Sequence, residues 1–171
     1  MKGYVQVYTG NGKGKTTAAL GLAVRALGAG KKVFIGQFVK SKHYSELETI
    51  DKLLKEITIR QYGMGCFIFD KPKEEDIQAA QNGLKEIIEI IKSDEYDMII
   101  LDEANIAVYY NLITADELIA AINKRNNQTE IIITGRYATQ EIMDFADLVT
   151  EMKEIKHYYQ QGVQARVGIE K

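Results

Sequence analysis

The fold of this chain is decided by the stretch YVQVYTGNGKGKTTAAL, residues 4–20. A strand-like run over 4–9 leads into a glycine-rich turn, and an alanine- and leucine-rich helix follows from Thr16. Strand, glycine turn, Gly-Lys-Thr and helix is the layout of a phosphate-binding loop. Glycine permits positive φ and a close approach of backbone N–H groups to an anion, and the helix N-terminus adds partial positive charge. The stretch therefore predicts a nucleotide phosphate site.

Each residue of the predicted loop has an expected role. Lys15 would reach the terminal phosphates as a point charge, and the Thr16 hydroxyl would ligate Mg²⁺. The usual pattern has a glycine where Thr9 stands, and here Gly10 comes one place late. An ordinary glycine turn after an edge strand is the alternative. The residues expected to hold the nucleotide are Gly10, Asn11, Gly12, Lys13, Gly14, Lys15, Thr16 and Thr17.

Composition limits the classes of protein to which the chain can belong. Its 171 residues predict a single domain over 1–171, and the net charge of -2 gives no general attraction to nucleic acid or anionic membranes. The one cysteine, Cys66, cannot form an internal disulfide. No apolar run has the length of a membrane span, and a strand follows Met1-Lys2-Gly3 directly. We therefore expect a cytoplasmic location.

Strand and helix patterns alternate along the whole sequence. Helix starts are indicated by capping-box spacings at Ser45 with Glu48 and at Thr114 with Glu117, and Pro72 fits the first turn of a helix. Strands without polar alternation, separated by helices, predict a doubly wound α/β domain with a mainly parallel sheet of about six strands, a P-loop NTPase fold of RecA-like type. The expected strands are 4–9, 33–38, 57–62, 98–101, 130–134 and 148–152.

A second motif follows the apolar strand that begins at Met98. That strand ends in Asp102 and Glu103, which is the form of a Walker B element. Because ligands collect at the carboxyl ends of parallel strands, both carboxylates should face the loop and serve Mg²⁺. Alternatively, they merely favour the N-terminus of the next helix. The two motifs together predict Mg-ATP binding and leave three functions open: a nucleoside kinase, a RecA-like ATPase and a nucleotide sensor without catalysis.

Longer sequence segments, which occur in one order along the chain, narrow the choice among these functions. Together they closely resemble the P-loop type of ATP:corrinoid adenosyltransferases, from about Gly3 to the C-terminus. The resemblance implies that Co(I) of a reduced corrinoid attacks the 5′ carbon of ATP and expels triphosphate. Against a kinase, no arginine cluster suggests a lid, since Arg60, Arg125, Arg136 and Arg166 are widely separated. The segments are residues 10–19, Arg25, Gln37-Phe38, 101–103, 132–136, Lys156-His157, 162–165 and Gly168-Ile169.

The resemblance also implies roles for particular residues. Lys15, Glu103, Phe67 and Phe69 are the implied catalytic residues, with the two phenylalanines displacing the lower axial ligand of cobalt. The enterobacterial pattern there is Phe-x-Trp directly after glycine; here Cys66 intervenes and the chain has no tryptophan. Two phenylalanines that pack a loop against the core are the alternative.

The remaining implications concern partners and two arginines. Arg25 and Arg136 are expected to contact nucleotide or corrinoid, and Thr16, Asp102 and Glu103 to serve the metal. An electron-donating reductase and a homodimer are also implied. Better-known members carry an N-terminal extension that helps to cover the partner's site, whereas this sequence begins at its first strand.

Overall fold

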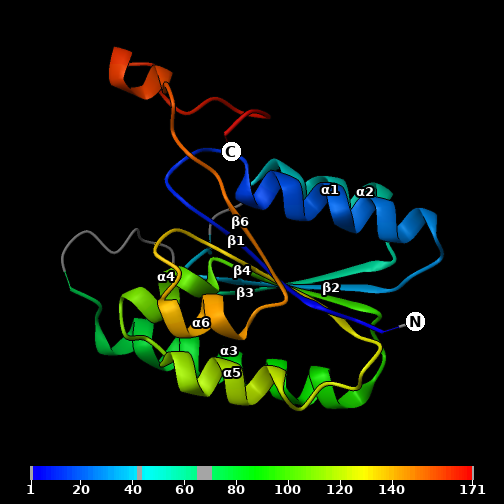
Figure 1. Ribbon diagram of the computed structural model, residues 1–171. Helices are drawn as coiled ribbons and strands as arrows, with labels where there is room; N and C mark the ends of the chain where they lie inside the picture. The colour runs from blue at the N-terminus through cyan, green and yellow to red at the C-terminus, as the bar shows by residue number, and fades with distance from the viewer. Residues whose placement is uncertain (1, 42–43, 65–70, 171) are drawn as a thin grey trace.

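Figure 1 shows the computed structural model, which describes residues 2–41, 44–64 and 71–170. Within these ranges six strands form one sheet in the order β3-β2-β4-β5-β1-β6, and every neighbouring pair is parallel. This confirms the predicted α/β class and parallel sheet. The strands are β1 (Val5–Thr9), β2 (Val33–Phe38), β3 (Ile57–Tyr62), β4 (Met98–Asp102), β5 (Glu130–Thr134) and β6 (Leu148–Glu151).

Helices cover both faces of the sheet (Figure 1). The face under α1 and α2 buries small and branched side chains such as Ala19, Ala23 and Ile100. The opposite face, under the other helices, buries larger side chains such as Phe34, Phe38 and Ile87. The helices are α1 (Lys15–Gly28), α2 (Ser45–Leu53), α3 (Glu74–Ser93), α4 (Ala104–Tyr109), α5 (Ala115–Ile122) and α6 (Gln140–Phe145).

The central strands explain why the sequence shows continuous apolar runs rather than alternation. All residues of β2 and β4 are buried, because each strand has a neighbour on both sides and helices on both faces. The register pairs Gln37 with Asp102, and Tyr8 with Thr134. The carboxyl ends of β2, β4, β5 and β1 therefore lie in a row at one edge of the sheet.

One of the two predicted capping boxes is present. The Thr114 side chain accepts a hydrogen bond from the Glu117 backbone N–H at 3.1 Å, and Glu117 accepts one from the Thr114 N–H at 2.7 Å. The prediction at Ser45 was wrong, because α2 already begins at that residue. Its N-cap is the extended residue Tyr44, which supplies no side-chain cap.

The chain leaves the sheet after β6 and crosses above the carboxyl edge. A short 3₁₀ helix, η1 (Tyr158–Gln161), precedes the return of the chain to the start of α1 (Figure 1). We call residues 157–170 the C-terminal strap. In the described part of the chain, no helix combines the length and the apolar character needed to cross a bilayer.

Candidate active site

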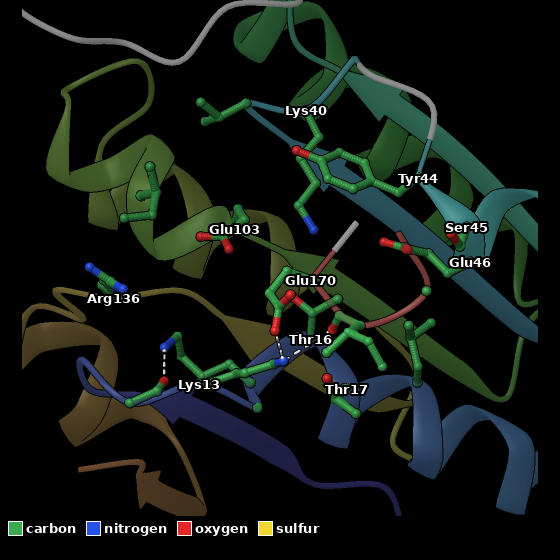
Figure 2. Close-up of a pocket in the computed structure, with 18 of the residues that line it drawn as sticks. Lys13, Thr16, Thr17, Lys40, Tyr44, Ser45, Glu46, Glu103, Arg136 and Glu170 are labelled. Carbon is green, nitrogen blue, oxygen red and sulfur yellow. Dashed lines mark hydrogen bonds and ion pairs between the residues drawn. The ribbon is translucent and has the colours of Figure 1, made fainter. Parts of the chain in front are cut away.

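A cavity of about 850 Å³ opens at the carboxyl edge of the sheet. This volume is in the range of sites for small molecules. Its wall combines the turn after β1, the segments after β2, β4 and β5, and the C-terminal strap (Figure 2). The residues that carry its chemistry are Lys13, Lys15, Thr16, Lys40, Glu103, Arg136 and Glu170.

The turn after β1 has the backbone of a phosphate loop. Gly10 and Gly14 have φ values of 93° and 120°, which side chains other than glycine rarely adopt. Gly12 donates to the carbonyl of Met152 at 2.7 Å, and a Cβ on it would lie 2.8 Å from the carbonyl oxygens of Met152 and Lys153. The turn is therefore built on glycine both for its dihedral angles and for its contact with the chain after β6.

Lys15 is folded back over this turn. Its ammonium donates to the carbonyl oxygens of Gly10 and Gly12, each at 2.7 Å. Burial lowers the pKa of Lys15, and the charge of Arg136 lowers it further. Each carbonyl contact is a hydrogen bond to a neutral acceptor, so an anion in the loop would offer the ammonium a stronger partner.

Asp102 is fully hydrogen-bonded at the end of β4. The hydroxyls of Thr16 and Thr134 donate to Oδ1 at 2.9 and 2.6 Å. The Lys40 ammonium and the Gln37 amide donate to Oδ2 at 2.8 and 3.1 Å. Burial opposes the charge of Asp102, yet Lys40 and the hydroxyl donors hold its pKa below the ordinary value. Asp102 is thus an anion that orients the Thr16 hydroxyl.

Glu103 stands next to Asp102 in a different environment. Its φ of 58° is left-handed, an uncommon conformation that concentrates at functional sites. The Glu103 backbone N–H donates to Thr134 Oγ1 at 3.1 Å, and its side chain faces the cavity (Figure 2). Burial and the neighbouring charge of Asp102 raise the pKa of Glu103. A cation in the cavity would relieve both effects.

Lys13 is bound by the C-terminal strap. Its ammonium lies 2.8 Å from Glu170 Oε1, and 3.1 Å from both the Tyr158 hydroxyl and the Ile169 carbonyl oxygen. Tyr158 and Arg166 also donate to the Glu170 carboxylate. The hydrogen bonds from Arg166, Lys13 and Tyr158, of which that from Arg166 has the largest effect, hold the pKa of Glu170 below its ordinary value. The strap therefore holds a carboxylate against a lysine of the phosphate loop.

The donor set fits a magnesium ion. Because the Thr16 hydroxyl gives its proton to Asp102, its lone pairs are available to a metal ion. The described residues contain no group of three or more His, Cys, Asp or Glu side chains that would form a metal cage. Mg²⁺ is usually held by one or two carboxylates together with substrate phosphates and water. Thr16, Asp102 and Glu103 would supply the protein's part of such a site, and phosphates and water would supply the other ligands.

The other predicted site residues are placed unequally. Thr17 and Arg136 line the cavity, whereas Asn11 lies in the loop outside its lining. Arg25 is exposed in the last turn of α1, where its charge acts on Tyr8, and it does not line the cavity. Phe67 and Phe69 lie outside the described residues.

Sequence reasoning missed the contributions of Lys40, Thr134 and Glu170. Lys40 and Thr134 carried a usable signal, because each is a polar residue at or just after the end of an apolar strand. Glu170 carried none, since its role depends on a long-range return of the chain to Lys13.

The chain is similar to proteins of known function over nearly its whole length. The sequence model of the family "ATP:corrinoid adenosyltransferase BtuR/CobO/CobP" matches residues 1–170. The corrinoid adenosyltransferase of Escherichia coli K12 is 36% identical over 171 residues, which cover 99% of this chain and 86% of that protein. Corrinoid adenosyltransferase CobA of Salmonella typhimurium is 36% identical over 175 residues, with the same coverage of both chains.

A solved structure shares the fold. It is the flagellar accessory protein FlaH from Methanocaldococcus jannaschii, with a TM-score of 0.61 and 17% sequence identity. The match covers 88% of this chain and 71% of that one. At this identity the likeness concerns the arrangement of helices and strands.

Proposed function

This chain belongs to the ATP:corrinoid adenosyltransferase family, and from that premise we propose how its residues serve the reaction. The enzyme uses ATP and a corrinoid as substrates and transfers the adenosyl group of ATP to the corrinoid. The phosphoryl-transfer alternative, a kinase or an ATPase, is not favoured, because curated relatives over nearly the full length are corrinoid adenosyltransferases.

The loop grips the triphosphate as a leaving group. Co(I) of the reduced corrinoid donates an electron pair to the 5′ carbon, a cobalt–carbon bond forms, and the bond from that carbon to the triphosphate oxygen breaks. Cobalt is thereby oxidised from Co(I) to Co(III), and triphosphate leaves with the electron pair of the broken bond. The observation that carries this proposal is the collection of Lys13, Lys15 and the N-terminus of α1 around one glycine loop.

Positive charge around the loop stabilises the leaving group. The charge that develops on the triphosphate is stabilised by the loop N–H groups and by Lys15, after its ammonium leaves the carbonyls of Gly10 and Gly12. When bound, Mg²⁺ neutralises part of the same charge. Thr16 would hold the ion directly, with its hydroxyl oriented by Asp102, and Glu103 would supply a carboxylate to the surroundings of the ion. Co(I) carries no proton, so no side chain is required as a general base.

The corrinoid side of the site rests on fewer residues. Phe67 and Phe69 follow β3, and we propose that they displace the lower axial ligand of cobalt and exclude water, which makes Co(II) easier to reduce. Arg136 and Tyr137 line the cavity on the β5 side and are candidates for contact with nucleotide or corrinoid. Arg25 gains no support from its exposed position. We further propose one nucleotide-binding domain over 1–171, a homodimer, a reductase that supplies the electron, and action in the cytoplasm.

The products of one reaction test the proposal. Purified protein is incubated with ATP, Mg²⁺ and chemically reduced corrinoid. We expect free triphosphate in an amount equal to that of the adenosylated corrinoid, which is recognised by its light-sensitive cobalt–carbon bond. The control omits the reductant and should give neither product. Steady formation of ADP and phosphate would contradict the proposed function.

A double variant tests the corrinoid side separately. Phe67→Ala with Phe69→Ala should abolish adenosylation when Co(II) must be reduced on the enzyme, while the affinity for Mg-ATP stays unchanged. Phe145→Ala, which removes a partly buried phenylalanine packed on the core away from the cavity, is the control for a general loss of packing. Equal activity of the double variant and the wild type would remove both phenylalanines from the mechanism.

A further inference from the structure

Lys40 brings a positive charge to the position where the metal site would form. Its side chain is 16% exposed, its ammonium lies 2.8 Å from Asp102 Oδ2, and the ring of Tyr44 lies 5.3 Å from that ammonium. The carboxylates of Glu103 and Glu46 also act on its charge. In Figure 2 the side chain runs into the cavity and ends facing the phosphate loop. The lysine therefore neutralises Asp102 from the cavity side.

The donors to Asp102 from within the sheet are held in place. Gln37 is fully buried, and its side-chain oxygen accepts from the Gln61 amide at 3.0 Å. Thr134 is fully buried in β5. Lys40, in contrast, has a flexible aliphatic stem and a compact charge that can be redirected by rotation of the side chain. Unlike Gln37 and Thr134, Lys40 can leave Asp102 without a movement of the sheet.

The backbone before Lys40 aims the side chain. Val39 has a φ of 58°, which is rare for a β-branched residue and signals a conformation imposed by the surroundings. A Cβ on Gly63 would lie 2.6 Å from the Lys40 backbone nitrogen, so the segment after β3 packs tightly against this turn. Such a conformation persists where the surrounding structure requires it, and here it directs a lysine into the cavity.

We propose that Lys40 occupies the place of the metal ion beside Asp102 in the free enzyme and turns to the triphosphate when Mg-ATP binds. Two cations beside one carboxylate repel each other, so a metal ion at Thr16 and Asp102 displaces the ammonium. The triphosphate then offers the displaced ammonium a charged partner. This exchange keeps the buried Asp102 paired in both states, which matters because an unpaired buried charge is strongly destabilising. The inference rests on the proposed use of Mg-ATP.

Two substitutions separate the roles of charge and shape. Lys40→Met keeps the length of the side chain and removes its charge, while Lys40→Arg keeps the charge and can bind Asp102 more firmly through two N–H groups. The measurement is calorimetric titration of ATP into each protein, first with a chelator and then over a series of Mg²⁺ concentrations. Lys52→Met is the matched control, since Lys52 is also paired with a carboxylate, Glu48, at 2.9 Å but is 66% exposed.

The exchange predicts opposite shifts for the two variants. Lys40→Met should bind metal-free ATP about as tightly as the wild type, because the Lys40 ammonium stays on Asp102 until a metal ion arrives, and should reach half-saturation at several-fold lower Mg²⁺, because no ammonium then competes with the ion for Asp102. Lys40→Arg should need more Mg²⁺ than the wild type. Lys52→Met should match the wild type.

The outcomes that overturn the inference differ from those that overturn the proposed function. A Lys40→Met protein with an unchanged or raised Mg²⁺ requirement contradicts the exchange. If this variant does not fold, an unchanged Mg²⁺ requirement in Lys40→Arg contradicts it equally. A wild-type chain that binds ATP neither with nor without Mg²⁺ contradicts the proposed function itself.

Discussion

Glu103 shows how one side chain can be unfavourable for folding and useful for the reaction. Folding places its carboxylate in a buried position beside the anion Asp102, and both circumstances raise its pKa above the ordinary 4.5. A carboxyl whose pKa rises on folding binds its proton more tightly in the folded state. The free energy of unfolding therefore falls as the pH rises through the raised pKa, because the folded protein must then hold an ionised carboxylate in this position.

Replacement of Glu103 by Gln should consequently stabilise the free protein. We expect a rise in melting temperature on the order of 2 °C at neutral pH, which shrinks as the pH falls through the raised pKa of Glu103 and the wild-type carboxyl takes up its proton. Adenosyl transfer should fall roughly 10- to 100-fold, as for other residues that orient the surroundings of a metal. Thermal unfolding over a pH series and a triphosphate-release assay measure the two effects.

The matched control is Glu89→Gln, which neutralises a carboxylate that is 73% exposed and paired with Lys92. This variant should change neither the melting temperature nor the rate. If Glu103→Gln lowers the melting temperature at every pH, the ionised carboxylate stabilises the fold and the stated cause is wrong.

At the scale of elements, the predictable parts are those whose signal is local. The buried strand β4 and the glycine turn after β1 were predicted because apolar runs and glycine spacing act within a few residues. The capping box at Thr114 was predicted for the same reason. The residues that the sequence did not predict depend on the order of the strands in the sheet. Lys40 reaches the site because β2 lies beside β4, and the sequence of neither strand indicates this pairing.

Arg25 is a predicted site residue that the fold places away from the cavity lining. Its place among the quoted family segments favoured contact with nucleotide or corrinoid, but α1 runs away from the loop, and the residue near the far end of the helix is exposed beside Tyr8. A helix rises about 1.5 Å per residue, so Arg25 lies about 15 Å along α1 from Lys15, and its contact with nucleotide or corrinoid stays a prediction.

The C-terminal strap occupies Lys13, a lysine of the predicted phosphate loop. Glu170 holds Lys13 by an ion pair, with Tyr158 and Arg166 around the same carboxylate. Glu170→Gln should release Lys13 and remove a negative charge beside the triphosphate, so we expect ATP to bind roughly two- to fivefold more tightly, the range for a partly exposed ion pair. Calorimetric titration of ATP measures the change.

Glu154→Gln is the control for this substitution, because Glu154 is an exposed acceptor for the Gln160 amide at 2.8 Å and does not line the cavity. Its affinity for ATP should equal that of the wild type. Weaker ATP binding by Glu170→Gln would show that the strap supports the nucleotide rather than competing with it.

At the scale of the whole molecule, the order of the strands determines the chemistry. Because β2, β4, β5 and β1 are neighbours, Lys40, Glu103 and the glycine loop line one cavity. Asp102 and Thr134 lie buried directly behind this lining. The same order leaves β6 at the edge of the sheet, paired with β1 and with all four residues exposed. Leu148 and Val149 thus present apolar side chains on an edge strand, a feature that proteins generally cover or interrupt.

The proposed homodimer would cover this edge. We expect the wild-type chain to sediment as a dimer and Val149→Lys to sediment as a monomer, because a lysine on an edge strand opposes pairing with a second chain. Val24→Lys, at a valine of α1 that is 53% exposed, is the control and should remain dimeric. Analytical ultracentrifugation over a concentration series, with circular dichroism to verify folding, makes the measurement. A monomeric wild type contradicts the dimer, and a dimeric Val149→Lys contradicts β6 as its interface, because burial of that lysine against a partner strand would leave its charge unpaired.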